Sequence, residues 1–193
     1  MGLGNHGKQY EKSRHNVGFM VADELARQFS ILNFKFSMKE NLKSEILKQI
    51  IKSEEVILAK PQTMMNASGF AVVKLLSNLA IKQLSDLWVV HDDLDLPLGK
   101  IKIRIGGGTA GHRGLESIVE EIGSADFVRF RLGIGHPGVA DDDKHKEVER
   151  YVLESFSGEE RHEASRMVKR ATEAIKLALD EGIEAAMNKF NLK

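Results

Sequence analysis

The chain of 193 residues contains no cysteine, only three prolines and no long hydrophobic run. Without cysteine it has no disulfide framework, no thiolate nucleophile and no cysteine-based zinc site, and a reducing compartment is favoured. No apolar stretch approaches the roughly 20 residues that a membrane span requires, and the first residues lack the charged-then-apolar layout of a signal peptide. We therefore expect a cytoplasmic protein that does not enter a membrane.

Positive and negative charges balance, with 28 lysines and arginines against 28 aspartates and glutamates. Any contact with nucleic acid must then come from a local basic patch, because bulk charge provides no attraction. The length fits one domain, and no proline-rich, serine-rich or low-complexity stretch marks a linker. We expect a single domain that spans residues 1–193.

Segments with the helical period of apolar residues alternate with shorter, strand-like runs. The helical segments lie near residues 22–29, 72–79, 115–122 and 164–178. The strand-like runs are residues 34–38, 46–51, 56–59, 87–90, 101–105 and 127–134. This alternation predicts an α/β fold with a mixed, mostly parallel twisted sheet sandwiched between helices. Ser157 and Glu160 form a capping-box pattern that marks the start of the last helix, and residues 135–146 are expected to form the longest loop.

Polar residues gather at the junctions between these elements, where sites are usually built. They are Asn5, His15 and Asn16 before the first helix, Met65 and Asn66 before the second, and Asp92 and His112 around a glycine-rich turn. Each cluster alone is weak evidence, because an asparagine before a helix commonly serves as its N-cap and a histidine beside a glycine turn is often a surface residue.

The glycine-rich turn, residues 106–111, precedes a helix, and its backbone N–H groups suit a phosphate or an RNA end. It lacks the Lys-Ser/Thr of a P-loop and the spacing of a dinucleotide fingerprint, so the sequence does not favour a nucleotide cofactor. A divalent metal on Asp92, Asp93, Asp95 and His112 is a further alternative, although no familiar ligand spacing is present.

Cations alternate with apolar residues in two strand-like runs. Lys102 and Arg104 alternate with isoleucines, and Arg129 and Arg131 alternate with Val128 and other apolar residues. A strand would place these cations on one face. The face is either simply solvated or a contact for RNA phosphates, and the lack of an intervening carboxylate favours RNA.

Together these stretches resemble the bacterial peptidyl-tRNA hydrolase family along nearly the whole chain. The matching segments are residues 2–5 (GLGN), 14–19 (RHNVGF), 60–61 (KP), 64–66 (MMN), 68–69 (SG), 91–97 (HDDLDLP), 106–108 (GGG), 111–112 (GH) and 133–138 (GIGHPG). The resemblance implies a monomer that hydrolyses the ester bond of peptidyl-tRNA without a metal or other cofactor, and that contacts the acceptor stem and 3′ end of the tRNA.

The resemblance also assigns roles to residues. It makes His15 the general base and Asp92 the carboxylate that orients it, consistent with an ordinary imidazole pKa near ~6.5. Substrate positioning falls to Asn5, Tyr10, Met65, Asn66 and His112, with Asn66 the natural donor to the oxyanion. Contacts to tRNA phosphates fall to Lys102, Arg104 and Arg131.

Two alternatives remain at this stage. One is an RNA-binding relative of the same fold in which catalysis is dispensable. The presence together of His15, Asp92, Asn5 and Asn66 argues against it. The other is the metal-dependent hydrolase or nuclease described above, for which chelator sensitivity would be the test.

The sequence departs from the family pattern in four places. His6 stands where a proline is usual, so the turn that presents Asn5 is expected to be less rigid. Arg113 replaces a more common asparagine, and residues 109–110 (TA) replace residues that are often histidine and glycine. Relatives usually have about four or five more apolar residues before residue 2, which predicts a shortened first strand and a poorly anchored loop at Asn5.

Overall fold

The computed structural model describes residues 1–29, 35–137 and 144–191. Its named strands form two three-stranded sheets. The first is wholly antiparallel and contains β1 (Ser37–Lys39), β2 (Ser44–Ile51) and β3 (Glu54–Pro61). The second has the order β4-β6-β5, from β4 (Trp88–Asp93), β6 (Val128–Gly133) and β5 (Ile101–Ile105).

The first residues of the chain join the two sheets. Gly2 forms a parallel bridge with Val90 of β4, and its N–H donates to the carbonyl of Ala59 in β3 at 3.0 Å. Leu3 N–H donates to the Val90 carbonyl at 2.9 Å, and the Leu3 side chain is fully buried. This short segment therefore leads directly from the sheet into the loop that carries Asn5.

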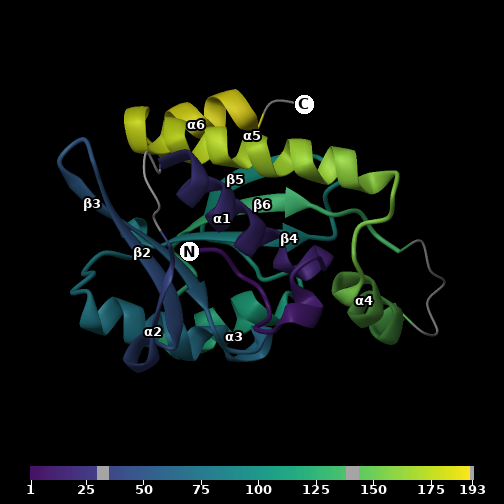
Figure 1. Ribbon diagram of the computed structural model, residues 1–193, viewed down its shortest axis with the longest axis horizontal. Coiled ribbons are helices and arrows are strands. Elements are labelled where there is room, and N and C mark those ends of the chain that lie inside the picture. The colour runs from purple at the N-terminus through teal and green to yellow at the C-terminus, as the bar shows by residue number, and fades with distance from the viewer. Residues whose placement is uncertain (30–34, 138–143, 192–193) are drawn as a thin grey trace.

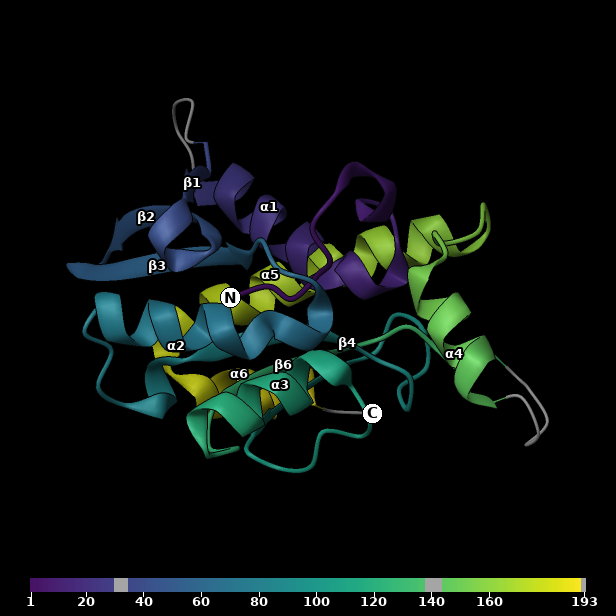
Figure 2. The same cartoon turned by 90° about the horizontal axis from the view of Figure 1, so that it is seen from below.

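Helices cover both faces of the second sheet (Figure 1). On one face lie α1 (Val17–Phe29), α5 (Glu160–Glu181) and α6 (Ile183–Phe190), whose apolar residues share a core with β4, β5 and β6. On the other lie α2 (Ser68–Asn78) and α3 (Arg113–Ile122), which share a second core with Val89. The remaining helix, α4 (Lys144–Leu153), lies at one end of this sheet, as Figure 2 also shows. No helix among the described residues is long and apolar enough to cross a membrane.

The expected mixed α/β sandwich is confirmed, with one correction to the pairing. Only β4 and β6 pair in parallel among the named strands, and β5 runs antiparallel to β6. The connection between β4 and β5, residues 94–100, is too short for the crossover that parallel strands need. The chain therefore turns back, and the sheet is mixed without being mostly parallel.

The sequence located the four main helices but not α4 or α6. The expected loop at residues 135–146 ends earlier, because α4 begins at Lys144, and part of that loop lies outside the described residues. Phe34 of the expected run 34–38 also lies outside them. The capping box is confirmed: Ser157 N–H donates to Glu160 Oε2 at 2.7 Å, and Glu160 N–H donates to Ser157 Oγ at 3.3 Å.

A glycine lets α2 and α3 approach closely. A Cβ on Gly69 would lie 2.0 Å from the carbonyl oxygen of Ser117, and the Gly69 N–H donates to Ser117 Oγ at 3.0 Å. Any larger residue would push the two helices apart. Because Met65 precedes α2 and His112 precedes α3, this contact brings two parts of the candidate site together.

Candidate active site

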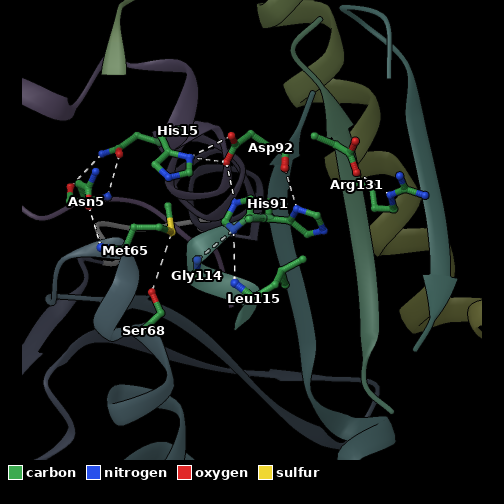
Figure 3. Close-up of polar contacts among 12 residues, drawn as sticks. Asn5, His15, Met65, Ser68, His91, Asp92, Gly114, Leu115 and Arg131 are labelled. Carbon is green, nitrogen blue, oxygen red and sulfur yellow. Dashed lines mark hydrogen bonds and ion pairs between the residues drawn. The ribbon is translucent and has the colours of Figure 1, made fainter. Parts of the chain in front are cut away.

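The centre of the site is a buried pair formed by His15 and Asp92 (Figure 3). His15 lies in a short 3-10 helix, Arg14–Asn16, directly before α1, and Asp92 lies near the carboxyl end of β4. Nδ1 of His15 is 2.9 Å from both carboxylate oxygens of Asp92. A carboxylate only accepts hydrogen bonds, so Nδ1 carries the proton and the lone pair of the imidazole lies on Nε2.

His112 is the second imidazole on the same carboxylate. Its Nδ1 accepts from the backbone N–H groups of Gly114 at 3.1 Å and Leu115 at 3.3 Å, which makes His112 the N-cap of α3. Its Nε2 lies 3.0 Å from Oδ1 of Asp92. Because Nδ1 accepts, Nε2 must carry the proton and donate to Asp92. His112 is therefore a partly buried N-cap with only 8% of its side chain exposed, and the alternative of a surface residue is wrong.

Two buried titratable groups have strongly shifted pKa values. Burial alone would raise the pKa of Asp92, but the hydrogen bonds that His15 and His112 donate to its carboxylate favour the ionised form and hold this pKa well below its usual range. Burial, which disfavours the charged imidazolium, lowers the pKa of His91 to about 3. The site therefore presents an ionised Asp92 and a neutral His91, whose Nδ1 donates to the Asp92 carbonyl at 2.7 Å.

Asn5 is firmly held, contrary to the expectation of a poorly anchored loop. Its N–H donates to Oδ1 of Asn16 at 2.8 Å, and Nδ2 of Asn16 donates to its carbonyl at 3.0 Å. Its own Oδ1 accepts from the N–H of Met65 at 2.7 Å. Asn16 is thus a buried residue that joins the start of α1 to the loop of Asn5. Neither Asn16 nor the exposed Asn66 caps a helix, because no side-chain hydrogen bond from either to a helix N-terminus is found among the described residues. These three hydrogen bonds hold the loop at Asn5 against the segment of Asn16 and the residues just before α2.

All of the residues assigned to catalysis and substrate binding line one pocket of about 420 Å³. They are Asn5, Tyr10, His15, Met65, Asn66, Asp92 and His112. Tyr10 is partly buried, whereas Asn66 is exposed at the edge. Part of the lining comes from α4, with Val152 and Leu153 among its contributors. This part of the lining was not foreseen.

The assigned phosphate contacts lie on β5 and β6, outside the residues that line the pocket. Cross-strand pairing sets Lys102 beside Arg131 and Arg104 beside Arg129, so all four side chains leave the same side of the sheet, although Arg129 is buried there. Lys102 and Arg104 are exposed. Arg131 donates from Nε to Asp93 at 2.6 Å and keeps 17% of its side chain exposed.

Arg129 does not belong to the solvated face that the alternation predicts. It is 1% exposed, its Nη1 donates to the Gly108 carbonyl at 2.7 Å, and its guanidinium lies 4.6 Å from the centroid of the Phe127 ring. Its role is to hold the glycine-rich turn against β6. Ile105 also departs from the pattern, because 56% of it is exposed at the end of β5.

Three departures from the family pattern have visible consequences. Nδ1 of His6 lies 2.6 Å from Oε1 of Gln62, which ties the turn to the end of β3. Ala110 adopts a left-handed backbone with φ of 51°, a conformation that costs a residue with a Cβ more than it costs glycine. Nη1 of Arg113 lies 3.1 Å from Oε1 of Glu149 in α4.

Arg14 is a buried residue that sequence reasoning did not single out. Its side chain is 6% exposed, its guanidinium lies 4.1 Å from the centroid of the Tyr151 ring, and Nη2 donates to Glu160 at 2.7 Å. It therefore ties the segment of His15 to α4 and α5. A lone arginine beside the histidine gave no periodic signal from which this role could be read.

Only one group of residues in the described part of the chain brings metal-ligating atoms close together. These are His15, Asp92 and His112, with ligand atoms within 4.8 Å of one another. Both imidazole nitrogens that face Asp92 carry protons in the network above, so a metal would have to displace both. Asp93 instead binds Arg131 and accepts from Asp95 N–H at 2.9 Å, so the proposed set of Asp92, Asp93, Asp95 and His112 is not assembled around one point.

The fold and the pocket define an α/β protein in which a carboxylate near the end of a buried strand orients a histidine, a class of site that serves hydrolysis. The family model described as peptidyl-tRNA hydrolase matches residues 1–193. The peptidyl-tRNA hydrolase of Carboxydothermus hydrogenoformans is 47% identical over 190 residues, which cover 98% of this chain and 96% of that one. That of Aquifex aeolicus is 46% identical over 191 residues, covering 99% and 94%.

Solved structures agree. The crystal structure of peptidyl-tRNA hydrolase from Acinetobacter baumannii has a TM-score of 0.87 and 32% identity, covering 98% of this chain and 92% of that chain. The chain belongs to the peptidyl-tRNA hydrolase family, and the family expected from the sequence is confirmed.

Proposed function

We propose that this protein hydrolyses the ester bond of peptidyl-tRNA, releasing peptide and tRNA from stalled or aborted translation. The observation that carries the proposal is the His15–Asp92 pair at 2.9 Å, which leaves Nε2 of His15 for the pocket. An imidazole held in this tautomer is the arrangement that takes a proton from water. A protein that only binds RNA would not need a histidine held in this way.

The proposed reaction uses water as the nucleophile. Nε2 of His15 removes a proton from a water molecule as its oxygen attacks the ester carbonyl, and the carbonyl oxygen becomes an oxyanion. Nδ2 of Asn66 is the assigned donor to that oxyanion, a contact typically worth about 10²–10³ in rate. The tetrahedral intermediate then expels the 3′ oxygen of the tRNA, which takes the proton back from Nε2.

Positioning of the substrate is assigned to the other pocket residues. Tyr10, Met65 and His112 line the pocket, and Asn5 fixes the backbone of Met65. Binding of the acceptor stem is assigned to Lys102, Arg104 and Arg131 on β5 and β6. Because phosphate contacts carry no sequence information, they suit an enzyme that accepts many tRNAs.

The proposal also covers the setting of the reaction. The chain acts as a monomer of one domain, without a metal or other cofactor, in the cytoplasm where translation takes place. The family's substrate supports this setting, since the tRNA of a stalled ribosome is released there.

The test is release of N-acetyl-aminoacyl groups from tRNA in EDTA, with the intact chain, His15→Ala and His162→Ala. We expect the intact chain and the His162→Ala control to be active, because His162 is exposed on α5 outside the pocket. His15→Ala should lose about 10²-fold or more. Activity that disappears in EDTA and returns with a divalent metal would favour the metal alternative. Intact tRNA binding without hydrolysis would favour the RNA-binding alternative.

A further inference from the structure

An exposed ion pair spans the pocket between two of its walls. Arg113 is the first residue of α3, Glu149 belongs to α4, and both line the pocket. Nη1 of Arg113 lies 3.1 Å from Oε1 of Glu149, with 61% and 54% of the two side chains exposed. Among the hydrogen bonds and ion pairs of the described residues, this is the one that Arg113 forms.

The exposure of both side chains makes the contact easy to exchange. Water screens an exposed ion pair, and holding two long side chains costs conformational entropy, so such pairs contribute little to stability. A guanidinium also binds a phosphate through two parallel N–H groups, which a single Nη1 contact to a carboxylate does not use. A phosphodiester that entered the pocket would therefore compete well for Arg113.

The position of Arg113 makes such a competitor part of the expected substrate. Arg113 directly follows His112, whose Nε2 reaches Asp92 at 3.0 Å. A tRNA whose ester bond lies at His15 must bring the phosphates of its last nucleotides close to this end of the pocket.

We infer that Arg113 exchanges Glu149 for a phosphodiester of the RNA 3′ end when substrate binds. Arg113 is then a binding residue for the terminal nucleotides, and Glu149 is the anion that occupies it in the free protein. The inference rests on the proposed function, because it takes the RNA end to lie in this pocket.

The exchange predicts opposite effects for the two partners. Loss of the Arg113 charge removes an attraction for phosphate, so KM should rise. Loss of the Glu149 charge removes both a competitor for Arg113 and a like charge beside the incoming phosphate, so KM should fall. An ion pair whose role is only to hold α3 against α4 would instead make both losses act in the same direction.

The experiment compares Arg113→Gln, Glu149→Gln and the double variant with the intact chain. Steady-state hydrolysis of N-acetyl-aminoacyl-tRNA gives KM and kcat, and filter binding of uncharged tRNA gives Kd. We expect Arg113→Gln to raise KM and Kd about 10-fold, the scale of one charge-assisted hydrogen bond. Glu149→Gln should lower both roughly two- to five-fold. In the double variant, loss of Glu149 should no longer improve binding, and kcat should stay within about two-fold throughout.

Arg166→Gln is the matched control, because Arg166 has the same exposed fraction of 61%, pairs with Glu163 on α5 and lies outside the pocket. The KM of the Arg166→Gln variant should equal that of the intact chain. Any result other than opposite shifts for the two single variants overturns the exchange. Activity of the intact chain reports separately on the proposed function, and if that activity is absent the Kd values for uncharged tRNA still decide between exchange and a purely structural pair.

Discussion

His91 shows how burial fixes a protonation state beside the reacting groups. It is 2% exposed and precedes Asp92 on β4, and its ring packs edge-on against His112 with centroids 5.0 Å apart. Its Nδ1 donates to the Asp92 carbonyl, and its Nε2 has no hydrogen-bond partner among the described residues. The fold therefore admits only the neutral imidazole, which keeps a positive charge away from the pair formed by His15 and Asp92.

The pKa of His91 predicts a loss of stability in mild acid. Folding lowers this pKa from its ordinary value of 6.5 to about 3, so between these pH values the unfolded chain binds a proton that the folded chain does not. The free energy of unfolding should then fall as pH falls through this window, by up to about 1.4 kcal/mol per pH unit from this group. Asp92 acts in the same direction only below its ordinary pKa of about 3.9.

The measurement is urea unfolding between about pH 4.5 and 7.5 for the intact chain and His91→Asn. Asparagine keeps a donor near the position of Nδ1 but does not titrate. Its slope of stability against pH should be smaller by up to about 1.4 kcal/mol per pH unit. Equal slopes in the two proteins would show that His91 is not the titrating group.

Residue types in ordered motifs were enough to predict which side chains meet in the pocket, but not their hydrogen bonds. The sequence indicated His15 with Asp92, yet it did not show that His112 caps α3 and donates to the same carboxylate. It also left Asn16 as a possible cap, whereas the fold uses it to hold Asn5. These roles depend on which segments the fold brings together, 20 residues apart for His112 and Asp92 and 11 residues apart for Asn5 and Asn16, and the residue types alone do not specify those pairings.

At the scale of elements, the two helices that the sequence missed have short apolar faces. In α4 the apolar positions Val148, Tyr151 and Val152 stand among charged residues, and in α6 the buried positions reduce to Ala186 and Phe190. So few apolar positions give only a weak helical period, whereas the long, regular apolar face of α5 gives a strong one. The part of the pocket lining that α4 contributes could therefore not be predicted from the sequence.

The end of α6 stabilises the open edge of β5. Oδ1 of Asn191 accepts from the N–H of Ile103 at 2.7 Å, and its Nδ2 donates to the carbonyl of the same residue at 2.8 Å. The amide thus pairs with the strand as another peptide would, on the side away from β6. This covers an edge that would otherwise offer unpaired backbone groups.

We expect Asn191→Ala to lower the free energy of unfolding by about 1–3 kcal/mol, because it leaves a part-buried N–H and C=O without partners. Amide hydrogen exchange at Ile103 should become faster, while that of β4 changes little. Asn78→Ala is the control, since Asn78 makes one exposed hydrogen bond, to the carbonyl of Lys74 within α2, and its loss should cost about 0.5 kcal/mol or less. Unchanged exchange at Ile103 would contradict the role of Asn191.

For the whole molecule, strand pairing was the feature least accessible from sequence. The elements and their order were largely predicted, but the antiparallel return of β5 and the separation into two sheets depend on which distant strands meet. The same pairing decides the electrostatics, because it sets the cations of β5 beside those of β6. Alternation along each strand predicted a face of cations. Only the three-dimensional structure shows that Arg129 is buried beneath this face and is not exposed on it.

Binding of tRNA should depend on this placement and not on net charge, which is zero. Each phosphate contact releases condensed counterions, so the slope of log Kd against log salt reports the number of contacts. Lys102→Gln and Arg104→Gln should each weaken binding of uncharged tRNA and reduce that slope by about 1. Arg129→Gln should leave the slope unchanged and lower stability, because this side chain is 1% exposed and donates to the Gly108 carbonyl. Equal slopes for Arg104→Gln and the intact chain would show that Arg104 on β5 does not contact the RNA backbone. An exposed cation that faces no phosphate releases no counterion when tRNA binds.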